Sequence, residues 1–408
     1  MKIKKIDLIN KIMILQICWI LFFGIAYSYF PKIALLTYFP DLLNGVLIIC
    51  ILDRMKKGLR KEYIWIAIFI LYVGLSILWG DLNWYYVVSS FRRYLTAFII
   101  YYVASEFITA KYLKKGLNLI LIALGIDVLV TGYQNLVLKL HPDFCNGIFG
   151  FKTYDNAMQG MFCLLISVTA MVYFIDKKWS KYKMIYAIGS SCLICAFAEI
   201  KAFYILILLA FFVAFFFRCG NRCLMKNVIK FAVIGIVLLI IAYKILEVIF
   251  PANLSTFFNL SQYVLYEQYG ARGGAGRLTS LSYIYKQVFK YNVWQTLIGK
   301  GLGAIANEYA YTIGKLFVSF GVVGLLLFIG WIFGLTTRRL KTVKYSSESL
   351  ISVIVIMMII VTLFVWNALF TQIVFLIFWI LGIHNTSMCQ NQDVKNFYRM
   401  EKENEREC

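Results

Sequence analysis

The sequence predicts an all-α, polytopic membrane protein with about 12 transmembrane helices and a large extracytoplasmic loop that contains an amphipathic helix. Of its 408 residues, 62% are hydrophobic and only 15% are charged, against about a quarter charged in an ordinary soluble domain. A soluble core of this length cannot bury that much apolar surface. Soluble enzymes, disordered chains and collagen-like fibres are therefore excluded.

Apolar runs with few charges follow one another along the chain, each long enough for a helix. The first run ends near residue 30. The others cover roughly 33–52, 63–79, 91–109, 117–138, 157–175, 184–200, 202–217, 228–250, 311–335, 349–366 and 368–384. Strands of a membrane barrel would alternate apolar and polar residues, and these runs do not. The chain thus divides into helices one to nine (1–250), a large extracytoplasmic loop (251–310), helices ten to twelve (311–385) and a cytoplasmic tail (386–408).

Basic clusters follow the second, fourth, sixth, eighth and tenth runs. Because lysine and arginine collect in cytoplasmic loops, both termini are predicted to be cytoplasmic. The formal net charge of +21 then reflects membrane orientation, and no nucleic-acid partner is expected. Most of the predicted outer loops are short, but two stand out: one over roughly 139–156 and the large loop, which is by far the longest polar stretch.

The large loop holds a candidate anion site. Glycines precede Arg277, and apolar residues then recur at helical spacing, which predicts an amphipathic helix over 277–291. A helix N-terminus beside an arginine suits phosphate oxygens. A solvated arginine next to a flexible turn is the alternative. Lys300, within a glycine cluster that we interpret as a tight re-entry into the membrane, could also contact a phosphate.

Glu308 lies just before the tenth run. Partial burial at the membrane boundary would raise its pKa toward the range of a general base, although a solvated loop glutamate is the alternative. Arg92, Arg93, Lys201 and Arg277 are positive residues on the predicted outer side, against the positive-inside bias. Their natural ligand is a doubly phosphorylated lipid headgroup; pairing of Lys201 with Glu199 is the structural alternative. No cofactor is expected. No acidic cluster suggests a metal.

Several motifs resemble those of the bacterial O-antigen polymerase and ligase superfamily, and more narrowly the capsular or exopolysaccharide repeat-unit polymerases known as Wzy proteins. They are a glycine–arginine pair, a G-x-G near the loop's end, a G-x-x-G opening the next span, and two basic span starts: Gly276-Arg277, Gly299-Lys300-Gly301, Gly321-Val322-Val323-Gly324, Phe91-Arg92-Arg93-Tyr94 and Glu199-Ile200-Lys201. Ligases of the superfamily carry a histidine before the G-x-x-G span. Here the region reads Ala306-Asn307-Glu308-Tyr309, which favours a polymerase.

The resemblance implies an inverting, metal-independent glycosyltransferase at the outer face of a bacterial plasma membrane. The donor would be a growing glycan on undecaprenyl pyrophosphate, and the acceptor a lipid-linked oligosaccharide repeat unit. Arg277 would stabilise the leaving diphosphate, Glu308 would be the base, and substrate would be bound by Arg92, Arg93, Lys201, Arg272 and Lys300. Membrane lipid, a chain-length regulator and a flippase are the implied partners.

Other classes of membrane protein remain open. A flippase or other transporter for lipid-linked oligosaccharides would need polar residues along a central path and usually two similar halves, and neither is evident. A ligase of the same superfamily would attach the glycan to another acceptor. A peptidoglycan glycosyltransferase of the shape-and-division type would have fewer spans.

Overall fold

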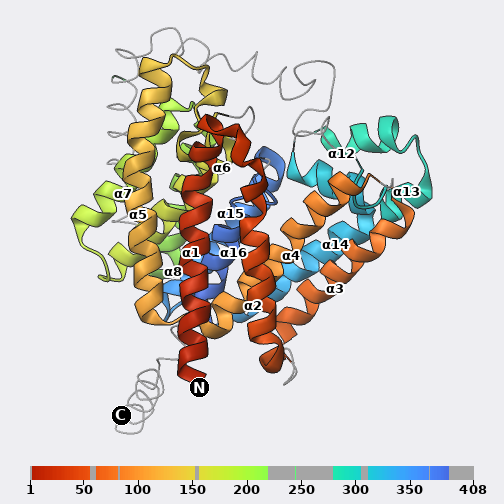
Figure 1. Cartoon of the computed structure of the whole chain (residues 1–408), viewed down its shortest axis with the longest axis horizontal. Helices are drawn as coiled ribbons and strands as arrows, with labels where there is room; N and C mark the ends of the chain where they lie inside the picture. The colour runs from red at the N-terminus through yellow and green to blue at the C-terminus, as the bar shows by residue number, and fades with distance from the viewer. Residues whose placement is uncertain are drawn as a thin grey trace.

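The computed structural model of the chain describes residues 2–55, 61–80, 83–151, 156–218, 244, 279–304, 311–366 and 368–385. The regular elements in these ranges are all helical (Figure 1). The α-helices are α1 Lys2–Tyr29, α2 Phe39–Met55, α3 Lys61–Leu75, α4 Trp84–Phe107, α5 Ala110–Gly132, α6 Asn156–Ile175, α7 Lys181–Phe197, α8 Lys201–Arg218, α12 Ser280–Tyr283, α13 Val293–Ile298, α14 Thr312–Leu340, α15 Ser347–Val365 and α16 Val374–Gly382. Short 3-10 or π segments adjoin them: η1 Pro31–Tyr38, η2 Ser76–Trp79, η3 Tyr133–Val137, η4 Pro142–Phe144, η5 Gly147–Phe149, η6 Ile284–Val288 and η7 Ile383–Asn385.

The prediction of a polytopic, all-α membrane protein is confirmed. Seven helical stretches in the described ranges are long and apolar enough to cross a membrane: Lys5–Tyr29, Pro31–Leu52, Ala110–Val137, Asn156–Ile175, Lys201–Arg218, Thr312–Thr337 and Ser347–Val365. Each predicted run on described residues contains a helix, whereas the run 228–250 lies outside the described residues except for residue 244. The count of about 12 spans therefore stays a prediction.

The basic residues that the structure describes after α4, α6 and α14 lie at one end of the bundle. At the start of α1, the side-chain amide of Asn10 donates to the carbonyl of Phe107 at the end of α4, at 2.9 Å. Lys178, after α6, lies 2.7 Å from Glu348 at the start of α15. The chain's N-terminus is at this end in Figure 1. If this end is cytoplasmic, as the positive-inside rule predicts, the starts of α4 and α14 face outward.

The loop over 139–156 is exposed at His141 and Asp143, but its residues 145–150 are buried. Cys145, Ile148 and Phe149 are buried and belong to the main apolar core. The fully buried carboxylate of Asp127 on α5 accepts a hydrogen bond from the backbone N–H of Ile148 at 2.8 Å. Gln159 on α6 donates to the same oxygen at 3.2 Å. These bonds hold the loop between the helices.

The predicted amphipathic helix over 277–291 is shorter than expected. Helical backbone runs through α12 and η6, and it stops because Lys290 and Tyr291 have positive φ angles of 49° and 62°. Its apolar side packs on α14, where the rings of Phe289 and Phe317 lie 5.2 Å apart. The first residues of the predicted helix, including Arg277, lie outside the described residues.

Candidate functional site

A cavity of about 300 Å³ lies at the end of the bundle opposite the chain's N-terminus. We call it the cation cavity, because two positive side chains line it. Its walls come from the first turns of α4, the glycine-rich loop after α13, the first turns of α14 and the segment before α16. The lining residues are Tyr85, Tyr86, Ser89, Ser90, Arg93, Tyr94, Leu302, Gly303, Ala304, Thr312, Lys315, Leu316, Ser319, Phe370 and Thr371.

The floor of the cation cavity is built on a break in α14. At Gly321 the backbone has φ 62° and ψ −161°, which interrupts the helix and leaves carbonyls of the preceding turn without their usual intrahelical donors. The glycine-rich loop supplies donors instead. The N–H of Lys300 donates to the carbonyl of Val318 at 2.7 Å, and the N–H of Gly301 donates to that of Ser319 at 2.9 Å. The G-x-x-G motif thus begins inside the span rather than opening it.

The other side of the glycine-rich loop is held by α3 and η2. The hydroxyl of Ser76 accepts a hydrogen bond from the N–H of Leu302 at 3.1 Å. Tyr72 donates from its hydroxyl to the carbonyl of Phe320 at 3.0 Å. Gly301 has φ +83°, and a Cβ there would collide with the backbone of Ser76 and Gly80. Only glycine fits this position without strain.

Arg93 and Lys315 supply the two positive charges of the cation cavity. Arg93 comes from α4, and its guanidinium donates to the carbonyl of Phe370 at 3.2 Å. Lys315 comes from the first turn of α14 and lines the same space. Among the described residues that line the cavity, none is acidic. Guanidinium and ammonium groups are strong hydrogen-bond donors to phosphate oxygens, so the cavity suits an anionic ligand such as a phosphate or diphosphate.

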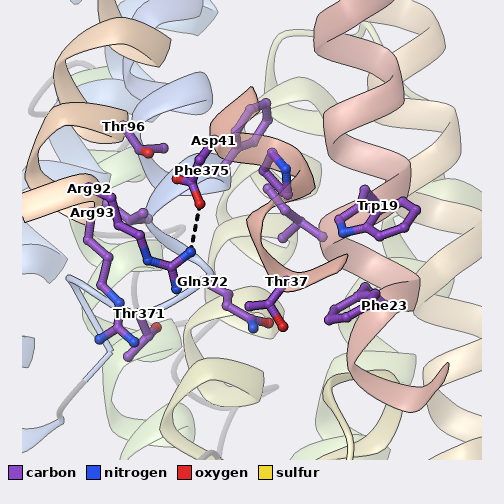
Figure 2. A pocket seen from close by; sticks show the side chains of 13 residues that line it. Trp19, Phe23, Thr37, Asp41, Arg92, Arg93, Thr96, Thr371, Gln372 and Phe375 are labelled. Atoms are coloured by element: carbon purple, nitrogen blue, oxygen red, sulfur yellow. Dashed lines mark hydrogen bonds and ion pairs between the residues drawn. The ribbon is translucent and has the colours of Figure 1, made fainter. Parts of the chain in front are cut away.

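Arg92, next in the chain to Arg93, faces a second and smaller hollow of about 60 Å³, which we call the side recess (Figure 2). Its guanidinium lies 2.7 Å from the carboxylate of Asp41 and 4.8 Å from the ring centre of Tyr38. The side recess and the cation cavity share Arg93 and Thr371. The side recess is lined by Trp19, Ile20, Phe23, Thr37, Pro40, Asp41, Arg92, Arg93, Thr96, Thr371, Gln372, Val374 and Phe375.

Two further residues of the predicted site, Lys201 and Lys300, are described by the structure, and their side chains line neither hollow. Lys300 contributes its backbone to the cavity floor, but its side chain lines neither hollow. Lys201 starts α8, two residues after Glu199, whose φ is +50°. Arg272, Arg277 and Glu308 lie outside the described residues, and their assignments stay predictions.

Sequence reasoning missed Lys315. It is a single charge near the start of a long apolar run, and charges in such positions are costly and tend to be functional. Arg92 and Arg93 were selected on a different ground, as positive residues on the predicted outer side. Within the described ranges, no group of three or more histidine, cysteine, aspartate or glutamate side chains could hold a metal ion.

No protein-family model matches this chain, and no curated protein matches it. The resemblance to repeat-unit polymerases therefore rests on the motifs in the sequence alone.

Proposed function

We propose that the protein is a glycosyltransferase that polymerises oligosaccharide repeat units at the outer face of a bacterial plasma membrane. It transfers a growing glycan from undecaprenyl pyrophosphate to a lipid-linked repeat unit, as in the synthesis of capsular or exopolysaccharides. The observation that carries the proposal is the cation cavity, where Arg93 and Lys315 converge from helices far apart in the sequence. A departing lipid diphosphate is the anion that this reaction has to stabilise.

The reaction we propose is a single displacement with inversion. A hydroxyl oxygen of the acceptor sugar forms a bond to the anomeric carbon of the donor. The bond from that carbon to the phosphate oxygen breaks, and its electron pair leaves with the lipid diphosphate. The hydroxyl proton passes to a base, for which Glu308 is our candidate. Arg93 and Lys315 stabilise the charge that develops on the diphosphate, with Arg277 as a further predicted contributor.

Hydroxyl-bearing side chains of the cation cavity support a carbohydrate substrate. Ser89 and Ser90 lie on the same stretch of α4 as Arg93, with Tyr85 and Tyr86 one turn earlier. The rings of the two tyrosines are perpendicular, with centres 5.4 Å apart. Hydroxyls can exchange hydrogen bonds with a sugar, and aromatic rings offer it an apolar face. A cavity of about 300 Å³ is at the lower end of the range for small-molecule sites.

The proposal is tested first by deleting the gene and analysing lipid-linked glycans. Loss of a polymerase leaves single repeat units exposed at the outer face of the membrane. Single units confined to the inner face would instead identify a flippase, and full-length polymer left on its lipid carrier would identify a ligase. Either of these outcomes overturns the proposal.

Single substitutions then test the cation cavity. We expect Arg93→Ala and Lys315→Ala each to reduce polymer formation about 100-fold or more, because each removes a group that stabilises the leaving diphosphate. Lys315→Arg should retain more activity than Lys315→Ala, since the charge remains. The matched control is Lys114→Ala, an exposed lysine at the other end of the bundle. Normal polymer from both alanine variants at wild-type expression would remove the cation cavity from the mechanism.

A further inference from the structure

The side recess differs from the cation cavity in charge. Within it, the carboxylate of Asp41 neutralises Arg92 at 2.7 Å. Much of the remaining lining is apolar, and Phe23, Val374 and Phe375 are themselves buried. A mainly apolar hollow, in which Asp41 pairs with Arg92, therefore adjoins the cation cavity, and Arg93 lines both. A ligand that fills both would have an anionic head and an uncharged, apolar continuation.

Two hydrogen-bond donors of the side recess lack acceptors. The indole nitrogen of Trp19 and Nε of Arg92 are buried and have no hydrogen-bond partner among the described residues. Figure 2 shows the indole of Trp19 across the recess from Arg92. A buried donor without an acceptor costs about 1–3 kcal/mol. The ester oxygen between a phosphate and a lipid chain would supply an acceptor at this junction.

One wall of the recess is formed by η1 and the start of α2. None of the described side chains of η1 is buried, and Leu35 is 79% exposed. A 3-10 segment of eight residues is unusually long, and such segments often mark hinges. Thr37 of η1 lines the recess, and Asp41, just after η1, holds Arg92. A chain passing beneath η1 would leave the recess toward lipid.

We infer that the side recess holds the first part of the hydrocarbon tail of an anionic lipid whose phosphate groups occupy the cation cavity. The inference rests on the proposed function and names the subsite for the lipid part of its substrate. The volume of about 60 Å³ is well below the roughly 150 Å³ that accommodates benzene, so the recess excludes a sugar ring and takes only a narrow chain.

The test compares two soluble probes, farnesyl diphosphate and inorganic diphosphate, binding to the purified full-length protein in detergent. Inorganic diphosphate reports on the cation cavity alone. Burial of the tail should make wild-type protein bind farnesyl diphosphate at least about tenfold more tightly. Thr37→Trp fills the recess and should remove this advantage without changing the affinity for inorganic diphosphate. The matched control is Leu36→Trp, because Leu36 is its exposed neighbour on η1 and does not line the recess.

The possible outcomes separate the two proposals. An unchanged preference for farnesyl diphosphate in Thr37→Trp, or an equal loss in both tryptophan variants, overturns the tail subsite even if diphosphate binding and polymerisation are normal. Loss of the preference for farnesyl diphosphate in Thr37→Trp, but not in Leu36→Trp, supports the tail subsite. Absence of polymerase activity together with that selective loss would overturn the proposed reaction and leave the lipid subsite standing. Thermal unfolding of both variants verifies that each is folded.

Discussion

The backbone N–H of Gly301 donates to the carbonyl of Ser319 at 2.9 Å, so the glycine-rich loop is joined to α14 next to the helix break. Leu302 and Gly303, directly after it, line the cation cavity, as does Lys315 one turn before Ser319. The loop and the break therefore form one unit. Movement of the loop would displace the floor of the cavity relative to its cations.

Substitution of Gly301 by alanine should disrupt this unit. The φ of +83° strains any L side chain, and the added Cβ meets the backbone of Ser76 and Gly80. We expect a loss of stability on the order of 1–3 kcal/mol and weaker diphosphate binding. Thermal unfolding and binding of inorganic diphosphate measure the two effects. Gly45→Ala is the control, because a Cβ at Gly45 meets nothing within 4 Å; equal behaviour of the two variants would contradict the assigned role of Gly301.

Replacing Lys315 by methionine should stabilise the ligand-free protein while it weakens anion binding. The ammonium shares a cavity with Arg93, and no acidic residue lines that cavity among the described residues. Removing one of two like charges relieves repulsion and the cost of keeping a charge away from water. The gain should be less than the roughly 2.5–3.5 kcal/mol that a charge costs at the bilayer centre.

Melting temperature and inorganic diphosphate affinity of Lys315→Met should therefore change in opposite directions. Such a trade-off is expected where a site is kept ready for its ligand at the expense of stability. A lower melting temperature with unchanged affinity would indicate that Lys315 has a packing role only.

The Asp41–Arg92 ion pair should show strong coupling in a double-mutant cycle. Both side chains are largely shielded, at 28% and 19% exposed. Asp41→Asn leaves the Arg92 charge without its partner, and loss of one member of a fully buried pair costs about 3–5 kcal/mol, an upper limit for this partly exposed pair. The double variant Asp41→Asn/Arg92→Gln should recover part of the lost stability. Additive losses in thermal unfolding would mean that the two residues act independently.

Asp127 should control the accessibility of Cys145. The thiol is buried, and burial raises its pKa to about 11, so little thiolate is present at pH 8. In a variant that keeps only this cysteine, we expect very slow labelling by a maleimide. Asp127→Ala removes the acceptor for the Ile148 N–H and should accelerate labelling by about tenfold or more.

The control for this measurement is Leu129→Ala, on the same helix but 74% exposed. Labelling of the control should remain as slow as in the parent protein. Fast labelling of Cys145 with Asp127 intact would show that the loop over 139–156 is not held in the bundle.

Sequence alone determined that the chain is a helical membrane protein, because apolar runs of bilayer length have no other stable form in lipid. It also selected Arg92 and Arg93, since positive residues on the predicted outer side run against the positive-inside bias. It could not separate their roles: Arg92 pairs with Asp41, while Arg93 reaches the cation cavity, and this depends on which neighbours the folded helices bring to each.

Only the tertiary structure decided three further points. It placed Lys315 in the same cavity as Arg93, it buried residues 145–150 in the core beside Asp127, and it put Gly321 at a helix break closed by the glycine-rich loop. Each depends on contacts between residues distant in the sequence. Local periodicity and propensity carry no information about such contacts, because they describe a helix by itself and not the face against which it packs.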